Sequence, residues 1–304
     1  MRIPRLSVLW FGALFVPVLP GQSCIDQQFE PRSTANGLEV TGRQPVVQTF
    51  QLAQTGALGR IDLKLRRRPG VTPVPMTFEI LPTDSAGKPV ASPLVTETIP
   101  ATAIASSGAY SWIAVRPTRK LAVTANTVLG VRLSVASTIG RAYDWNGDTG
   151  NPYTRGDSFL RVNTGPLSFD RGFRVYVGPA ATTVTYGTGF PGRTGVPNLS
   201  ATPPILGTDT RWTLGNSSGT ATTGLFLLGS GRASLPTPIG GTVLLRIAFA
   251  LPVQVPSRGG SLTAMVPDNP NLCGARLQTQ LIVADPQAAR GFAFSRGVEL
   301  VFGL

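Results

Sequence analysis

The sequence predicts an all-β protein made of two consecutive antiparallel β-sandwiches. The chain has 35 glycines and 27 prolines in 304 residues, and only 14% of its residues are charged. Such composition is typical of short strands joined by many turns. Apolar and polar residues alternate in short runs, most clearly over 58–66, where Ile61, Leu63 and Leu65 share one face. No stretch has the period of an amphipathic helix.

The N-terminus predicts a signal peptide over 1–23. Arg2 and Arg5 precede an apolar run over 6–19, and small residues stand just before Cys24. The run is shorter than the ~20 residues that a membrane-spanning helix needs. We therefore expect a secreted or cell-surface protein without a membrane span after cleavage. An alternative is lipid attachment at Cys24, which Gly21 disfavours because lipoprotein signals prefer leucine at that position.

Composition divides the mature chain into a polar leader and two strand-rich regions. We expect the leader over 24–44, a first sandwich over 45–178, a linker over 179–183 and a second sandwich over 184–304. The first region holds about nine short strands at the spacing of a β-sandwich. The linker region is small and uncharged, as domain boundaries often are.

Residue usage excludes much catalytic chemistry. The chain has no histidine, which removes histidine-based triads, histidine metal sites and the usual neutral-pH proton shuttle. Carboxylate-based hydrolysis of glycosides stays open, but it needs a pair of acids, and only Asp144, Asp148 and Asp157 are concentrated in sequence. We expect no catalytic residues. The net charge of +12 favours an anionic partner, while export argues against a nucleic acid.

The densest group of ligand-type side chains lies over 143–153. The rings of Tyr143, Trp145 and Tyr153 suit stacking on sugars, and Asn151 suits hydrogen bonding to hydroxyls. An alternative is that the rings fill the core, because Tyr143 and Trp145 share one strand parity. The outward basic row of the 58–66 strand is a second candidate binding surface, or else an ordinary solvated face. That row consists of Arg60, Lys64 and Arg66.

The same stretch suggests a calcium site. Asp144, Asn146 and Asp148 place oxygen ligands at alternate positions, and Asp157 could add another. The pattern resembles the start of an EF-hand loop but lacks its later glycine and glutamate. The alternative is that aspartate, asparagine and glycine simply form turns here.

The first region also resembles carbohydrate-binding-module-like jelly rolls of exported bacterial proteins, which are usually accessory domains. The resemblance implies a jelly-roll-like first sandwich in an exported protein, and it brings no established activity. It rests on an order of short motifs: Gln48-Thr49-Phe50, the 58–65 strand, the 83–89 turn, the 143–153 stretch, and the closing Asp170 to Val177 strand.

The second region resembles the C-terminal β-sandwich repeat of secreted proteins from planctomycetes and related bacteria. Phe190 stands where that family commonly has a cysteine, so the resemblance implies no family disulfide, and pairing of Cys24 with Cys273 stays open. The matching motifs are Tyr186-Gly187-Thr188-Gly189, Pro197-Asn198-Leu199, Leu225-Phe226-Leu227-Leu228-Gly229, Val266-Pro267-Asp268-Asn269-Pro270, Gln278-Thr279-Gln280, Asp285-Pro286 and Ser295-Arg296-Gly297-Val298.

Together these observations predict a non-catalytic secreted or cell-surface protein that binds a glycan through its first domain. The expected partner is an extracellular polysaccharide or an anionic cell-surface glycan. The first alternative is a structural or adhesive envelope protein without a small ligand. The second is a carboxylate-based enzyme acting on carbohydrate.

Overall fold

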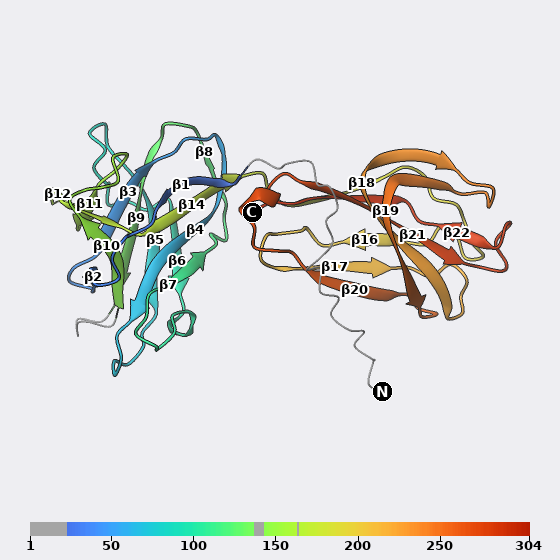
Figure 1. The fold of residues 1–304 in the computed structure, drawn as a ribbon, viewed down its shortest axis with the longest axis horizontal. Coiled ribbons are helices and arrows are strands. Elements are labelled where there is room, and N and C mark those ends of the chain that lie inside the picture. The colour runs from blue at the N-terminus through green and yellow to red at the C-terminus, as the bar shows by residue number, and fades with distance from the viewer. Residues whose placement is uncertain (1–22, 137–142, 163) are drawn as a thin grey trace. The chain divides into compact units, whose positions relative to one another are not determined.

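A computed structural model describes residues 23–136, 143–162 and 164–304. The chain forms two compact units, Cys24–Gly178 and Pro179–Leu304, here called the first and second domains (Figure 1). The described residues are almost entirely strand and turn, with two short 3-10 turns at Ala101–Ala103 and Pro270–Leu272. None of the described segments is a helix with the length and apolar character to cross a membrane.

The first domain is a sandwich of two antiparallel sheets. One sheet has the order β1-β14-β4-β10-β13, with β2 beside β10 and with β7 and β8 beside β4. The other has the order β12-β11-β3-β9-β5-β6. In chain order the strands are β1 (Ile25–Phe29), β2 (Gly37–Val40), β3 (Val46–Gln51), β4 (Gly56–Arg67), β5 (Met76–Pro82), β6 (Val95–Ile99), β7 (Ser111–Val115), β8 (Leu121–Val123), β9 (Val128–Val135), β10 (Tyr143–Thr149), β11 (Ser158–Leu160), β12 (Pro166–Leu167), β13 (Phe169–Arg171) and β14 (Phe173–Gly178).

Strand alternation builds the core of the first domain. On β4, Ile61, Leu63 and Leu65 are fully buried, and they pack in one cluster with inward residues of both sheets. The polar residues between them point to the opposite side, as the period of two requires. The outer side of β4 is therefore a separate, polar surface of this sheet.

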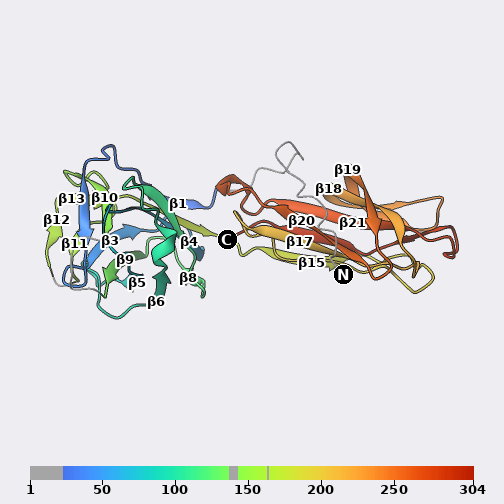
Figure 2. The same ribbon diagram turned by 90° about the horizontal axis from the view of Figure 1, so that it is seen from below.

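The second domain is also a sandwich of antiparallel sheets (Figure 2). Its core joins both sheets, and Trp212 packs edge-on against Phe226 with ring centroids 5.7 Å apart. The prediction of two consecutive antiparallel β-sandwiches is thus confirmed. The larger sheet runs β15 (Thr182–Tyr186), β23 (Gly297–Val301), β21 (Arg276–Ala284), β18 (Thr222–Pro236) and β19 (Thr242–Val255), with β22 (Phe292–Phe294) beside β21, and the smaller runs β16 (Leu199–Ala201), β17 (Asp209–Leu214) and β20 (Gly260–Met265).

Two segments differ from the expectation. The supposed leader contains β1 and β2, which pair with β14 and β10 as parts of the first sandwich. The sequences of β1 and β2 are short and show no alternation of apolar and polar residues. Their partner strands are distant in the chain, so no local pattern reveals the pairing. In the second domain, β15 begins at Thr182, inside the expected linker. The expected signal peptide lies outside the described residues, apart from Ser23.

Both cysteines are buried and disulfide-bonded, so neither is a free thiol. Cys24 stands immediately before β1, and Cys273 follows the second 3-10 turn. A free nucleophilic thiol is therefore not available at either position.

Candidate functional site

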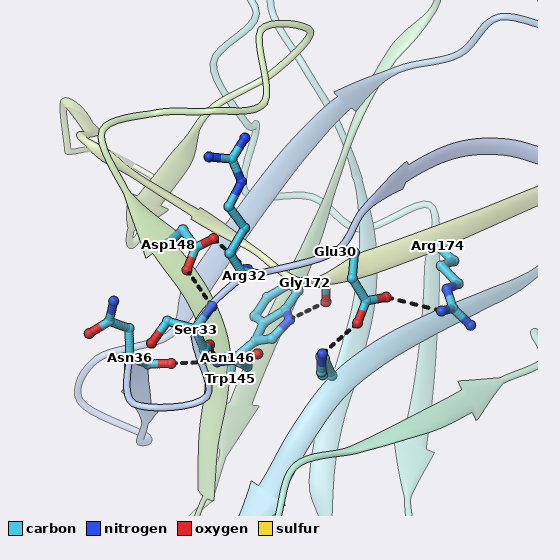
Figure 3. Close-up of polar contacts among 10 residues, drawn as sticks. Glu30, Arg32, Ser33, Asn36, Trp145, Asn146, Asp148, Gly172 and Arg174 are labelled. Atoms are coloured by element: carbon cyan, nitrogen blue, oxygen red, sulfur yellow. Dashed lines mark hydrogen bonds and ion pairs between the residues drawn. The ribbon is translucent and has the colours of Figure 1, made fainter.

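The predicted binding loop begins as a core strand. Tyr143 and Trp145 lie on β10 with no exposed surface. The Trp145 indole N–H donates to the Gly172 carbonyl oxygen at 2.9 Å (Figure 3), and the Tyr143 hydroxyl donates to the Val74 carbonyl oxygen at 2.6 Å. Burial raises the pKa of Tyr143. The expectation that these rings stack on a sugar is therefore wrong, because neither ring presents a face to solvent.

Tyr153 and Asn151 are also engaged within the protein. The Tyr153 ring is buried edge-on against Phe173, with centroids 5.0 Å apart, and its hydroxyl donates to Gln27 Oε1 at 3.0 Å. Burial raises the pKa of Tyr153 well above its ordinary value. Asn151 adopts a left-handed backbone with φ of 51°, and its amide donates to Asp157 at 3.3 Å. Tyr153 thus joins the segment after β10 to β1 and β14, and Asn151 bonds within that segment.

The predicted calcium ligands do not converge. Asn146 and Asp148 lie two residues apart on extended β10, which separates their Cα atoms by about 7 Å. Asp148 accepts the backbone N–H groups of Arg32 and Ser33 at 2.7 and 3.3 Å, which ties the segment after β1 to β10 (Figure 3). The Asn146 amide donates to two carbonyl oxygens of that same segment. These groups fasten the chain to the sheet.

Asp144 and Asp157, the other two predicted calcium ligands, are also bonded to side chains of the protein. Asp144 is fully buried and is paired with two arginines, and Asp157 accepts from the Asn151 amide. Across the described residues, no group of three or more acidic, cysteine or histidine side chains could hold a metal ion. The alternating oxygens belong to a strand, whereas a calcium ion needs a loop that folds around it.

The outer side of β4 carries a different assembly, which we call the outer ladder. It has three tiers, and in each tier a cation lies over an aromatic ring and bonds to a carboxylate. We name the tiers after their β4 residues, Arg60, Lys64 and Arg66. The three predicted basic residues therefore share one face, as their alternation indicated.

The Arg60 tier is closed, meaning that its carboxylate is shielded from solvent by its own partners. The Arg60 guanidinium donates to both oxygens of Asp62, at 2.6 and 2.8 Å, and lies 4.6 Å from the centroid of the Tyr176 ring. The Tyr176 hydroxyl donates to Asp62 at 2.8 Å. Asp62 is 1% exposed, and burial raises the pKa of Tyr176 to about 12. The carboxylate is thus sealed by its own neighbours.

The Arg66 tier is closed in the same way. Arg66 Nε donates to Asp144 at 2.8 Å, and the guanidinium lies 4.6 Å from the Tyr110 ring centroid. Arg68 Nη2 donates to the same carboxylate at 2.7 Å, and this hydrogen bond raises the pKa of Arg68. Burial raises the pKa of Tyr110. Asp144 has no exposed surface, so its two arginines are committed to it.

The Lys64 tier is the open one. Glu30 bridges two cations, accepting from Lys64 Nζ at 2.5 Å and from Arg174 Nη2 at 3.0 Å (Figure 3 labels Glu30 and Arg174). Both cations lie over the half-buried Trp112 ring, at 5.5 Å for Lys64 and 4.1 Å for Arg174. The Glu30 side chain is 52% exposed. This tier therefore combines an accessible carboxylate, two cations and an indole at the surface.

Sequence reasoning located the basic row but missed its aromatic partners. Trp112 pairs with Lys64 on the outer side, while Ile113 and Val115 point inward. The two branched residues Ile113 and Val115, separated by one position, indicate which face of the strand points inward and therefore place Trp112 on the outer face. Arg174 and Glu30 come from other strands and segments, so no local pattern joins them to β4.

The second domain has a smaller cluster of similar composition. Glu299 accepts from Arg232 at 3.0 Å, from Arg276 at 3.0 Å and from Gln278 at 2.9 Å. The Arg232 guanidinium lies 4.4 Å from the Tyr186 ring centroid. Burial acts to raise the pKa of Glu299, but the hydrogen bonds outweigh it, and the pKa lies below its ordinary value. Here the carboxylate is 6% exposed and enclosed by its partners.

No family model and no curated protein matches the chain. Among solved structures, the chain is similar to the N-terminal CBM22-1–CBM22-2 tandem domain of Paenibacillus barcinonensis Xyn10C, with 11% identity and a TM-score of 0.27. The match covers 92% of this chain and 90% of that one. At that score the likeness carries no argument about the site.

Proposed function

We propose that the first domain is a non-catalytic carbohydrate-binding domain, with a glycan lying across the Lys64 tier of the outer ladder. The observation that carries the proposal is Trp112, a half-buried indole on the outer side of the sheet beside hydrogen-bonding groups. An indole stacks on the apolar face of a pyranose, and charged side chains bond its hydroxyls. The proximity of an indole to charged groups on one surface supports a sugar contact there.

The accessibility of the carboxylates selects this tier over its two neighbours. Asp62 and Asp144 are buried beneath the arginines that hold them, so a ligand would have to break a satisfied buried pair to enter. Glu30 is half exposed, and an exposed ion pair contributes only about 0–1 kcal/mol. A sugar can therefore compete for the cations of the Lys64 tier at small cost.

The residues of the outer ladder support a binding role without catalysis. Hydrolysis of a glycoside usually uses two carboxyl groups that flank the scissile bond. Each carboxylate of the outer ladder is instead bonded to basic side chains of the same ladder. With no histidine in the chain, the remaining chemistry favours recognition.

The proposed setting is outside the cell. The basic, apolar and small-residue order of 1–23 supports export, and we propose a secreted or cell-surface protein of the planctomycete type. The glycan would then be an extracellular polysaccharide or part of the cell surface.

Binding of the purified mature protein to a panel of polysaccharides, by affinity electrophoresis or a glycan array, tests the proposal. We expect Trp112→Ala to lose at least about tenfold in affinity while its melting temperature stays close to that of the parent. Tyr186→Ala is the matched control, since Tyr186 lies under an arginine in the second domain. Absence of binding to every glycan, with retention in envelope fractions, would favour a structural or adhesive role instead.

A further inference from the structure

We propose that the Lys64 tier selects a uronic acid residue, whose carboxylate takes the position that Glu30 occupies between Lys64 and Arg174. This inference rests on the proposed glycan-binding function and names the class of sugar. In the unliganded protein, Glu30 acts as an internal stand-in for the ligand carboxylate.

The first support is the geometry of the bridge. The two oxygens of Glu30 go to different cations, Oε1 to Lys64 and Oε2 to Arg174. A carboxylate on a sugar ring can make the same two contacts, because it offers two oxygens in one plane. Glu30 stands one residue after the end of β1, which places it off the strand and leaves its side chain half exposed.

The second support is the indole over which both cations lie. Arg174 and Lys64 lie 4.1 and 5.5 Å from the Trp112 ring centroid, so positive charge and an apolar ring adjoin. A uronic acid carries its carboxylate on the pyranose ring whose C–H groups stack on aromatic faces. A uronate whose carboxylate meets the two cations therefore brings its pyranose ring next to the indole.

The third support is charge. The outer ladder has five basic side chains against three carboxylates, so it keeps an excess of positive charge. When Glu30 moves aside, the Lys64 tier presents two cations to one incoming carboxylate. The basic members are Arg60, Lys64, Arg66, Arg68 and Arg174, and the acidic members are Glu30, Asp62 and Asp144.

The test compares polygalacturonate with its methyl-esterified form, which has the same backbone without the charge. Binding of the full mature protein is measured by affinity electrophoresis and calorimetry. We expect the free acid to bind at least about tenfold more tightly, with the difference shrinking at high salt. Lys64→Gln and Arg174→Gln should remove the difference, whereas Arg232→Gln, the same charge change in the second domain, should leave it.

Glu30→Gln separates a stand-in from an ordinary ligand-binding residue. Removing the competing carboxylate should tighten binding of polygalacturonate several-fold, and weaker binding would overturn the proposal. Melting curves of each variant exclude loss of fold as the cause. Equal binding of the acid and its ester would overturn the uronate inference and leave the glycan proposal standing. Binding of neither, and of no other glycan, would overturn both.

Discussion

Trp145 and Trp112 lie on either side of strand β4, but Trp145 belongs to the core and Trp112 to the outer surface of the sheet. Trp145 pairs with Leu65 on one edge of β4, and Trp112 pairs with Lys64 on the other. Trp145 has no exposed surface and its indole N–H is bonded to a backbone oxygen, while Trp112 lies half buried under two cations. The difference is one of parity, since a one-residue shift moves a side chain to the other face. A dense group of ligand-type residues in the sequence can thus belong to a core strand, as on β10. The sparser basic row of β4 instead lies on the surface.

The largest expected effect is the loss of stability when the buried tryptophan, Trp145, is replaced. Trp145→Ala should lower the free energy of unfolding of the first domain by about 3–5 kcal/mol, because it leaves a cavity and removes one of the two hydrogen bonds to the Gly172 carbonyl. Trp112→Ala should cost less, about 1–2 kcal/mol, the size of two cation–π contacts at a half-buried ring. Denaturant unfolding followed by circular dichroism measures both. Equal losses for the two variants would contradict the assignment of inner and outer faces.

The carboxylates of the outer ladder should follow the same division. Asp144→Asn removes the charge that two arginines share in a buried position, and we expect a loss of about 1–3 kcal/mol in unfolding free energy. Glu30→Gln changes a half-exposed pair and should cost between about 0 and 1 kcal/mol. Thermal unfolding of the two variants side by side distinguishes a closed tier from the open one. A larger loss for Glu30→Gln would reverse the interpretation.

The smallest expected effect concerns the closed cluster of the second domain. Because the folded pKa of Glu299 lies below its ordinary value of 4.5, its stabilising contribution is fully present above that value. The contribution is lost as the pH falls through the folded pKa. Melting temperatures between about pH 6 and about pH 3 should therefore decline less steeply in Glu299→Gln than in the parent. An unchanged slope would show that Glu299 is not linked to folding.

The sequence predicts the inner and outer faces of a strand where the strand itself alternates apolar and polar residues. On β4 the alternation of buried aliphatic and basic residues was sufficient, because the period of two is a local property. On β10 the shared parity of Tyr143 and Trp145 indicated burial, but the carboxylate, amide and glycine residues between and after them resemble a turn. Their burial there depends on β2, β4 and β13, which come from distant parts of the chain. The Lys64 tier was missed for the same reason, since Glu30 and Arg174 are 34 and 144 residues from their partners.

Gly172 links the two sides of the sheet through a single carbonyl group. Its oxygen accepts both the Trp145 indole N–H and the backbone N–H of Lys64, at 2.9 and 3.1 Å. A Cβ at this position would lie 2.9 Å from the Lys64 Cβ, so only glycine permits the approach. The core thereby fixes the backbone that carries the Lys64 ammonium group. A ligand that meets this cation finds its backbone already in place, and little ordering entropy of the strand is left to lose on binding.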